Sequence, residues 1–361
     1  NSLAYDKASN LVQFIDNNGT VVTNTYDSLN RLIRRDITRA NNVKGSTVQT
    51  FEYDGLSRLT LSTDNNDPTD TSDDSTVTRA YDSLGRLVEE TQNGKVISTN
   101  WQQAGNLTDL TYPNNRKLEY TFDQLDRLKT IRNAGNSSNI AAYDYLGGRL
   151  IERVYGNNTR LSMLNDTGNA DAGYDALGRL TQLRHLTSAN SLIAGFQFGY
   201  NRENSKLYSQ DLTQTALSEV YQYDSVYRIA DFQRGTLVAT KDAVAGTPTQ
   251  SQAWQLDGVG NWAMTSVNGI AQPQTISAMN EYSSFAGTAN THDLNGNLSD
   301  DGDKLLTFDF ANRLVEVRKK SDNSLIVRYT YDAFNRRTSK YFSREVKGEY
   351  KPDVNTIALY H

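Results

Sequence analysis

Short runs of alternating hydrophobic and polar residues, separated by four-residue turn-forming breaks, organise the chain from end to end. Residues 79–91 show the pattern: Arg-Ala-Tyr precedes the break Asp-Ser-Leu-Gly, and Arg-Leu-Val-Glu-Glu-Thr follows it. Alternation with a period of two residues is typical of a half-buried β-strand, and no segment of useful length keeps the period of an amphipathic helix. The pattern therefore predicts β-hairpins in an almost purely antiparallel, all-β protein.

The breaks belong to a repeated sequence: Tyr-Asp, two variable residues, Gly, Arg and Leu. The clearest copies begin at Tyr81 and Tyr174. Looser copies begin at Tyr5, Tyr26, Tyr53, Trp101, Phe122, Tyr143, Tyr200, Tyr223, Leu256, His292, Phe308 and Tyr331. Such self-similarity predicts an array in which each unit packs on its neighbours.

We expect one continuous array of about 14 units over residues 1–361, with no domain boundary. Inserts at 64–74, 157–172 and 241–251 decorate the array without dividing it. The repeat pattern is already running at the first residue and still running near the last. We therefore expect the chain to be a piece of a longer protein.

The repeat residues have the properties that a hairpin turn needs. Asp begins the break because its carboxylate can accept backbone N–H bonds two residues on. Gly ends it because it adopts positive φ without a steric clash. Elsewhere the Gly position holds residue types that tolerate this conformation: Asn30, Asn312, Asn335 and Asp126. Ser9, Ser57 and Tyr227 fit the position less well, so we expect their turns to differ.

The Tyr and the Leu of each unit flank the turn on opposite strands and are expected to pair across one face of the hairpin. The Arg can reach back to the Asp of its own turn. We therefore interpret the repeat residues as structural anchors and not as catalytic groups. The anchors of the best-defined units are Tyr26, Asp27, Tyr53, Asp54, Tyr81, Asp82, Gly85, Arg86, Leu87, Phe122, Asp123, Tyr174, Asp175, Gly178, Arg179, Leu180, Tyr331 and Asp332.

The tandem Tyr-Asp-x-x-Gly-Arg-Leu units resemble the YD repeats of the Rhs family, which toxin-complex B and C components and teneurins share. The resemblance covers essentially the whole chain, and the number of tandem copies makes it specific. It implies a large twisted antiparallel sheet that spirals into a shell or open barrel. In bacterial members such a shell commonly encloses a C-terminal toxin segment, and in teneurins it belongs to a cell-surface adhesion protein.

Two features of the bacterial family do not occur in this sequence. An Asp-Pro-x-Gly signature and a self-cleaving aspartyl site usually follow the repeats, and neither Asp67-Pro68 nor Pro352-Asp353 matches them. We therefore expect the C-terminal core and toxin segments to be absent from this chain. The units between 256 and 337 are similar to the last repeats before such a core.

Composition narrows the range of functions. Hydrophobic residues make up 37% of the chain, and 21 Tyr and 11 Phe supply aromatic mass that suits half-buried strands. The net charge of −5, without a basic stripe, argues against a nucleic-acid partner. The absence of Cys excludes a disulfide framework, a thiolate nucleophile and a Cys-ligated metal. No stretch has the apolar length of a membrane span.

Two acidic stretches are weak candidates for Ca²⁺ because they offer hard oxygen ligands: Asp67 and Asp70 in one, Asp293 and Asp303 in the other. Neither stretch has the EF-hand order of ligands, and solvated turns use the same residue types. His185, His292 and His361 show no metal-ligand spacing, and His292 occupies the aromatic position of a repeat. We expect no metal and no cofactor.

Three functional hypotheses follow, in decreasing order of support. The first is a structural segment of a shell around a C-terminal toxin or effector, secreted or at the surface of a bacterium. The second is a cell-surface adhesin or carbohydrate-binding module, for which Trp101, Trp254 and Trp262 with exposed tyrosines are candidate sugar contacts. The third is a polysaccharide-active enzyme, but no nucleophile–base pair or phosphate-binding loop occurs, and we expect no enzymatic activity. The expected partners are the rest of the parent polypeptide, its enclosed segment, and glycans or proteins at a cell surface.

Overall fold

The computed structural model describes residues 1–66, 68–164, 173–346 and 349–352. The chain divides into two compact units, of which unit 1 comprises residues 1–99 with 276–361 and unit 2 comprises residues 100–275. One boundary falls within the strand β9 (Lys95–Trp101), and the other falls before the last residue of the strand β23 (Ile270–Ile276). The repeat sequence runs through both units, and its continuity as one array stays a prediction.

Unit 1 is built from antiparallel strands. Its N-terminal part contains β1 (Ser2–Tyr5), β2 (Leu11–Ile15), β3 (Val21–Tyr26), β4 (Leu32–Thr38), β5 (Val48–Tyr53), β6 (Leu59–Asp64), the 3-10 turn η1 (Thr71–Asp73), β7 (Ser75–Tyr81), β8 (Leu87–Gln92) and β9. Each of these strands pairs with the next along the chain.

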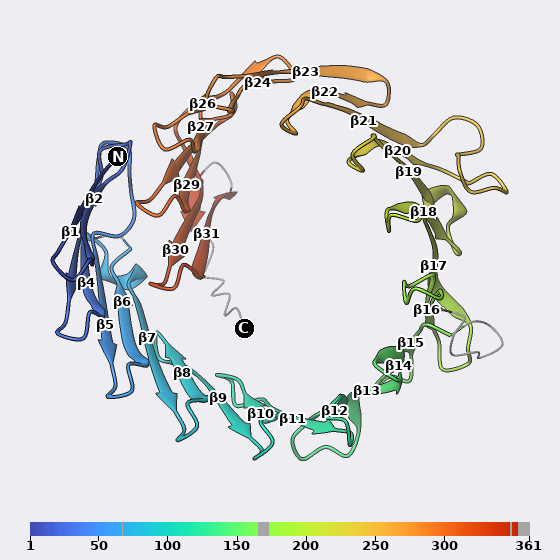
Figure 1. Ribbon diagram of the computed structural model, residues 1–361, viewed down its shortest axis with the longest axis horizontal. Coiled ribbons are helices and arrows are strands. Elements are labelled where there is room, and N and C mark those ends of the chain that lie inside the picture. The colour runs from blue at the N-terminus through green and yellow to red at the C-terminus, as the bar shows by residue number, and fades with distance from the viewer. Residues whose placement is uncertain (67, 165–172, 347–348, 353–361) are drawn as a thin grey trace. The chain divides into compact units, whose positions relative to one another are not determined.

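The C-terminal part of unit 1 contains β24 (Tyr282–Phe285), β25 (Thr288–Ala289), β26 (Thr291–His292), β27 (Leu298–Asp300), β28 (Lys304–Phe308), β29 (Leu314–Lys319), β30 (Leu325–Tyr331), β31 (Arg337–Val346) and β32 (Glu349–Pro352). The strands β26 to β32 form a seven-stranded antiparallel sheet. Figure 1 shows its red strands beside the blue N-terminal strands of the same unit.

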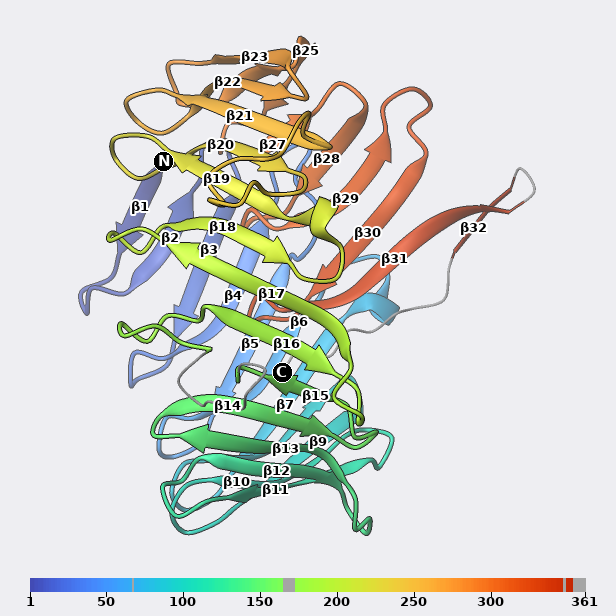
Figure 2. The ribbon, with the colours of Figure 1, turned by 90° about the vertical axis from the view of Figure 1, so that its right-hand side faces the viewer.

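Unit 2 repeats the same plan. It contains β10 (Leu107–Thr111), β11 (Lys117–Phe122), β12 (Leu128–Asn133), β13 (Asn139–Leu146), β14 (Arg149–Tyr155), β15 (Arg160–Ser162), β16 (Gln182–Leu186), β17 (Leu192–Tyr200), β18 (Lys206–Asp211), η2 (Thr215–Leu217), β19 (Glu219–Tyr223), β20 (Ile229–Arg234), β21 (Gln250–Leu256), β22 (Trp262–Val267) and β23 (Ile270–Ile276). Each strand pairs antiparallel with its successor, so the strands lie side by side like rungs in Figure 2. In the described part of the chain the two 3-10 turns are the only helical segments, and the predicted all-β antiparallel class is confirmed.

The hairpin turns have the backbone conformation that the repeat chemistry requires. Gly85 and Gly178 have φ of +79° and +80°, and Asn30, Asn312, Asn335 and Asp126 also have positive φ. The expectation that the turns of Ser9, Ser57 and Tyr227 differ is wrong. Their φ values are +67°, +63° and +63°, and each residue donates its backbone N–H to the Asp carbonyl three residues earlier, as Gly85 does. The hydrogen bonds of the five-residue turn therefore outweigh the preference of Ser and Tyr for negative φ at the fourth position of the turn.

The register places Tyr opposite Leu at the base of the hairpins, as the repeat predicts. Tyr81 pairs with Leu87 beside a bulge in β7, and Tyr174 forms an isolated bridge with Leu180. The unit assigned to Tyr143 is shifted, because Tyr145 pairs with Leu150 and Tyr143 lies two residues earlier in the strand. Two consecutive glycines, Gly147 and Gly148, close that hairpin more tightly than the other turns do, which moves the aromatic position by two residues.

Several turns of the same kind carry no Tyr-Asp sequence and are not predicted by the repeat. The backbone N–H of Tyr112 bonds to the carbonyl of Arg116, and that of Ser277 to the carbonyl of Glu281. The residue before the closing position is Asn in both turns, Asn115 and Asn280, with φ of +63° and +64°. An Asn or Gly at the fourth position of the turn, after two variable residues, is therefore the sequence feature that predicts these additional turns.

Buried positions in unit 1 are partly apolar and partly polar. Val22, Ile37 and Phe310 form a hydrophobic cluster against which Phe14 packs. Inward-facing positions of the neighbouring strands are polar and equally buried, among them Gln49 and Asp64, each 1% exposed. Because buried polar groups require partners, the contacts of these side chains determine how this unit is held together.

The left-handed turn position gives a direct test of the fold. Gly85→Val should reduce the free energy of unfolding by roughly 1–3 kcal/mol, because a β-branched residue is strained at positive φ. A Cβ at Gly85 would lie 3.9 Å from the nearest atom outside the turn, Arg58 Nη1, so the loss reports the backbone and not a clash. Gly85→Asn is the matched control and should cost much less. Equal losses of stability in urea unfolding of the two variants would contradict the turn assignment.

Candidate functional site

The turn carboxylate is fully engaged in holding its own hairpin. In the unit at Tyr81, Asp82 Oδ1 accepts the backbone N–H groups of Leu84 and Arg86, each at 2.9 Å, and Oδ2 accepts Arg86 Nε at 2.7 Å. The backbone hydrogen bond from Arg86 is the largest influence on Asp82 and lowers the pKa of its carboxyl group. A carboxylate with these fixed donors is a structural group, poorly suited to accept a proton in catalysis.

The turn arginine joins each hairpin to the next. Arg58 donates to its own Asp54 through Nε at 2.7 Å and, through Nη1, to the carbonyl oxygen of Asp82 in the following unit at 3.0 Å. Its guanidinium carbon lies 4.9 Å from the ring centre of Tyr81, whose hydroxyl donates to the carbonyl oxygen of Leu59 at 3.0 Å. One arginine and one tyrosine therefore make three links between adjacent units.

The same links recur along both units. Arginine-to-carbonyl bonds to the next turn are made by Arg31, Arg58, Arg179, Arg228 and Arg313. Tyrosine hydroxyls donate to a carbonyl of the preceding unit at Tyr26, Tyr53, Tyr81, Tyr145, Tyr174, Tyr200, Tyr223 and Tyr331. The rings of Tyr81 and Tyr174 are half-buried. The structure thus places the predicted anchors in one recurring arrangement per hairpin, and Phe122, which lacks a hydroxyl, lies at the same position without the tyrosine bond.

The weak Ca²⁺ candidates are found in ordinary turn contacts. Asp70 accepts the backbone N–H and the hydroxyl of Ser72 at the start of η1, and Asp303 pairs with Lys304 at 3.0 Å. Asp293 accepts from Asn297 and Asn18. Asp67 lies outside the described residues. Within the described ranges no group of three or more His, Asp or Glu side chains has the arrangement of a metal site.

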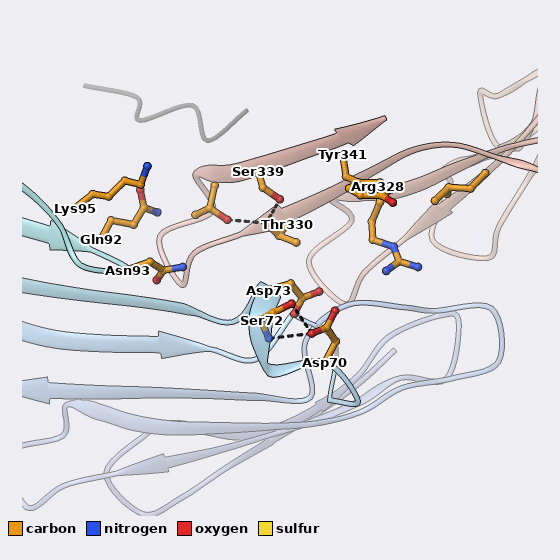
Figure 3. Close-up of a pocket in the computed structure, with 12 residues that line it drawn as sticks. Asp70, Ser72, Asp73, Gln92, Asn93, Lys95, Arg328, Thr330, Ser339 and Tyr341 are labelled. Carbon is orange, nitrogen blue, oxygen red and sulfur yellow. Dashed lines mark hydrogen bonds between the residues drawn. The ribbon is translucent and has the colours of Figure 1, made fainter. Parts of the chain in front are cut away.

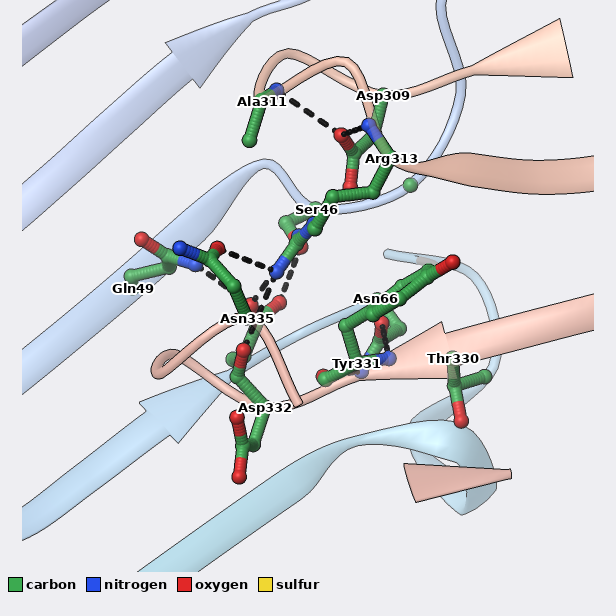
Figure 4. A network of polar contacts seen from close by, with 12 residues as sticks. Ser46, Gln49, Asn66, Asp309, Ala311, Arg313, Thr330, Tyr331, Asp332 and Asn335 are labelled. Carbon is green, nitrogen blue, oxygen red and sulfur yellow. Dashed lines mark hydrogen bonds and ion pairs between the residues drawn. The ribbon is translucent and has the colours of Figure 1, made fainter. Parts of the chain in front are cut away.

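The C-terminal hairpins of unit 1 dock on its N-terminal strands through polar contacts that the repeat does not encode (Figure 4). Asn66, 5% exposed, accepts the backbone N–H of Tyr331 and donates to its carbonyl oxygen, both at 2.7 Å. The side-chain amide therefore imitates the pairing of a β-strand. This docks β30 on residues 265 positions earlier in the chain.

Two carboxylates share an arginine in the buried part of this contact. Arg313 donates to Asp309 at 2.5 Å and lies 3.7 Å from Asp64, and neither carboxylate is exposed. Asp64 also accepts from Ser46 and from Gln49. Burial is the largest influence on Asp64 and raises the pKa of its carboxyl group, although these hydrogen bonds act in the opposite direction.

A second ion-pair cluster lies nearer the ends of β8 and β30. Glu90 accepts from Arg79 at 2.8 Å and from Arg336 at 2.7 Å, and the guanidinium of Arg79 lies 3.9 Å from the ring centre of Phe334. Burial opposes the ionisation of Glu90, but the bonds from Arg336 and Arg79 outweigh it and hold its pKa below the ordinary value.

One feature of the sequence indicates which turns are covered in this contact. The turns at 309–313 and 332–336 contain Phe310 and Phe334 at the variable positions. In the turns of Asp54 and Asp82 the third residue is a leucine that stays exposed, Leu56 at 73% and Leu84 at 70%. Phe334 takes the place of this exposed leucine in its turn. Phe310, one position earlier in its own turn, is buried in the cluster with Val22 and Ile37.

A cavity of about 470 Å³ opens beside this contact, between the η1 turn, the β8–β9 hairpin and the strands β30 and β31 (Figure 3). Asp70 and Asp73 line one side, and Lys95 and Arg328 contribute positive charge from other sides. The residues that line it are mostly polar and carry both signs of charge. On one side of the cavity the hydroxyl of Ser72 donates to the carboxylate of Asp70 at 2.6 Å, in the turn that begins η1.

The fold resembles that of solved bacterial toxin complexes. A mutant Tc holotoxin pore of Photorhabdus luminescens matches over 96% of this chain and 19% of its own, at 12% sequence identity and a TM-score of 0.75. A TcdB2–TccC3 complex without its hypervariable C-terminal region matches over 97% of this chain and 20% of its own, at 11% identity and a TM-score of 0.74. This chain has the Rhs-type YD-repeat fold.

The resemblance that the repeats predicted is thus confirmed at the level of the fold. The chain spans about a fifth of the length of the chains that it matches. No family model and no curated protein sequence matches it. Among the described residues no helix is long and apolar enough to cross a membrane.

The Asn66 contact can be tested by substitution. Asn66→Ala leaves the backbone N–H and carbonyl of Tyr331 without these partners in a buried place and should reduce the free energy of unfolding by about 1–3 kcal/mol. Asn157→Ala is the control, because exposed Asn157 bonds only within its own turn and water can replace it. Thermal and urea unfolding would measure both losses. Equal losses would contradict a docking role for Asn66.

The lowered pKa of Glu90 predicts that the stability of the folded protein depends on pH. Its pKa in the folded protein lies below the ordinary value of 4.5, so its stabilising contribution is complete above that pH and is lost as the pH falls through the folded value. We expect Glu90→Gln to be less stable than the wild type at neutral pH and to lose less stability on acidification. Melting temperatures measured across this range would show the difference, and parallel curves for the two proteins would refute it.

Proposed function

We propose that the chain is a structural segment of a YD-repeat shell that encloses a toxin or effector segment of its parent polypeptide. The proposal rests mainly on the contacts that the repeat residues make. Asp, Arg and Tyr, which are common in active sites, are here committed to links within and between hairpins. Side chains that repeat the same structural contact in many hairpins hold the hairpins in position and are not expected to take part in catalysis.

The comparisons support this proposal through the fold. The matched structures are a holotoxin pore and TcdB2–TccC3 complexes, and one of them is described as lacking a hypervariable C-terminal region. By analogy, the partners of this chain are the rest of its parent polypeptide and the segment inside the shell. The protein is secreted or presented at a bacterial surface, requires no cofactor and is not an enzyme.

Protection from proteolysis tests the enclosure. The parent polypeptide and its segment downstream of the repeats, expressed alone, are digested under the same native conditions. We expect the downstream segment to be cleaved much more slowly within the parent than alone, because a shell excludes the protease. Equal cleavage rates, or a parent that ends without any further segment, would show the proposal to be wrong.

The absence of catalysis is tested separately on the present chain. We expect no hydrolysis of peptides, esters, nucleotides or common polysaccharides, because the repeat carboxylates are held in turns by backbone donors. Turnover that is abolished by a single Asp or Glu substitution would overturn this part of the proposal.

A further inference from the structure

A cavity of about 450 Å³ opens in unit 2 where two neighbouring turns lack the usual arginine link. The turn at 201–205 ends in Ser205, whereas the turn before it ends in Arg179, which donates to the carbonyl oxygen of Asn201 at 2.7 Å. A serine side chain is too short to reach the next turn in this way. Residues of both turns, Asn201 and Tyr227 among them, line the cavity.

Tyr227 is both strained and exposed at this cavity. It occupies the fourth position of its turn with a φ of +63°, a conformation that is unfavourable for a bulky side chain. The residue is 58% exposed, so packing in a core does not compensate for the strain. Strain of this kind concentrates at functional sites. Tyr208, Tyr221 and Tyr223 line the same cavity, which makes its lining strongly aromatic.

The hydrogen-bond acceptors of the lining are largely committed to the fold. The carboxylate of Asp224 accepts two backbone N–H groups and one guanidinium N–H within its own turn. The amide oxygen of Asn201 accepts two backbone N–H groups of its turn. Asp242 accepts the hydroxyl of Thr240 at 2.5 Å. A ligand in the cavity therefore finds few acceptors for its own donors.

Hydrogen-bond donors, in contrast, remain available. Within the described ranges the hydroxyls of Tyr208 and Tyr227 have no hydrogen-bond partner. Asn201 uses its oxygen in the turn and keeps its NH₂ group as a donor, and the amide of Gln222 can donate as well. The cavity thus suits a ligand that accepts hydrogen bonds and has few to donate. A proline-rich peptide is such a ligand, because proline has a carbonyl oxygen and no backbone N–H.

The strands beside the cavity limit the conformation of a bound peptide. β18 pairs with β17 and β19, and β19 pairs with β18 and β20, so neither is an edge strand to which a peptide could add as a further strand. A polyproline II helix needs no such edge. It has no internal hydrogen bonds and docks on grooves that are lined by aromatic rings.

Two of the rings are held in place by the fold. Tyr208 pairs with Gly199 of the neighbouring strand, where a Cβ atom would approach the ring to 2.1 Å. The hydroxyl of Tyr223 donates to the carbonyl oxygen of Lys206 at 2.7 Å. A stiff peptide loses little entropy when it binds to rings that are already fixed, so both partners are preorganised.

The charges near the rings favour an uncharged ligand. Lys206 Nζ lies 4.7 Å from the ring centre of Tyr221, and Lys241 Nζ lies 5.1 Å from that of Tyr208. These ammonium groups repel a basic side chain or an organic cation, and the two carboxylates of the lining repel an acidic one.

We infer that this cavity binds an uncharged, proline-rich segment of a partner protein in the polyproline II conformation, with Tyr227 as the exposed stacking ring. The hydroxyls of a sugar donate as well as accept and would need free acceptors, so the cavity favours the peptide. Trp254 and Trp262, the sugar contacts suggested by the sequence, lie on the β21–β22 hairpin and do not line it. The inference is independent of the proposed enclosure, because the site lies within unit 2 and needs no downstream segment.

Tyr227→Asn removes the ring and preserves the turn. Asn occupies the same position, with positive φ, at Asn204 and Asn335, so the substitution also relieves the strain. We expect a higher melting temperature and about tenfold weaker peptide binding. Ser57→Asn is the matched control, because Ser57 has the same φ of +63° and does not line the cavity. It should raise the melting temperature as well but leave binding unchanged.

Binding is measured by calorimetry on the full chain with an oligoproline peptide that is acetylated and amidated, and with neutral oligosaccharides as the alternative ligands. Tyr208→Phe removes one hydroxyl donor and should weaken oligoproline binding severalfold. Oligoproline binding to the wild type and to Ser57→Asn, weakened in Tyr227→Asn and in Tyr208→Phe, supports the inference. No oligoproline binding, binding that either tyrosine variant leaves intact, or binding of oligosaccharides in its place would overturn it. A Tyr227→Asn protein less stable than the wild type would show that the ring packs as part of the fold, and would overturn it as well.

Discussion

The structure depends on turn arginines, each of which is bonded to two turns at once. A two-stranded hairpin is marginal in water because it has too little surface to bury. In this chain Arg58 is bonded to the carboxylate of its own turn and to the backbone of the next, and it stacks on the tyrosine that begins that turn. An exposed ion pair alone contributes little, but here the charge, the carbonyl bond and the ring contact act on the same boundary between units. Repetition of that boundary lets short hairpins form a stable sheet.

The docking of the C-terminal hairpins in unit 1 follows different physics. It buries carboxylates, amides and guanidinium groups around a small apolar cluster of Val22, Ile37 and Phe310. Such groups are costly to bury unless they are paired, so the contact tolerates few alternative arrangements. Asn66 illustrates this, because its amide satisfies both backbone groups of Tyr331 and would satisfy neither if the register shifted by one residue.

The proposed enclosure places a clear demand on the repeat. A shell needs uniform units, and the turn residues accordingly form the links between neighbouring hairpins. Tyr227 is a local exception among these turns, because a bulky residue there has a φ of +63°. An array of nearly equivalent units can accommodate such an exception, because the cost is borne mainly by one unit and its neighbours.

The sequence by itself determined the class of the fold, the position of most hairpins and the conformation of their turns. These features are local: the Asp82 carboxylate and the residues that it holds lie within five positions of one another. Even there the sequence misjudged Ser57 and Tyr227, because the hydrogen bonds of the turn outweigh the preference of a single side chain. Only the tertiary structure decided that Asn66 meets Tyr331, that Glu90 meets Arg336, and that four tyrosines surround one cavity. These residues stand far apart in the chain or on different hairpins, and the repeat has no position that marks them. Their meeting depends on how whole hairpins pack, which a pattern with a period of a few residues does not contain.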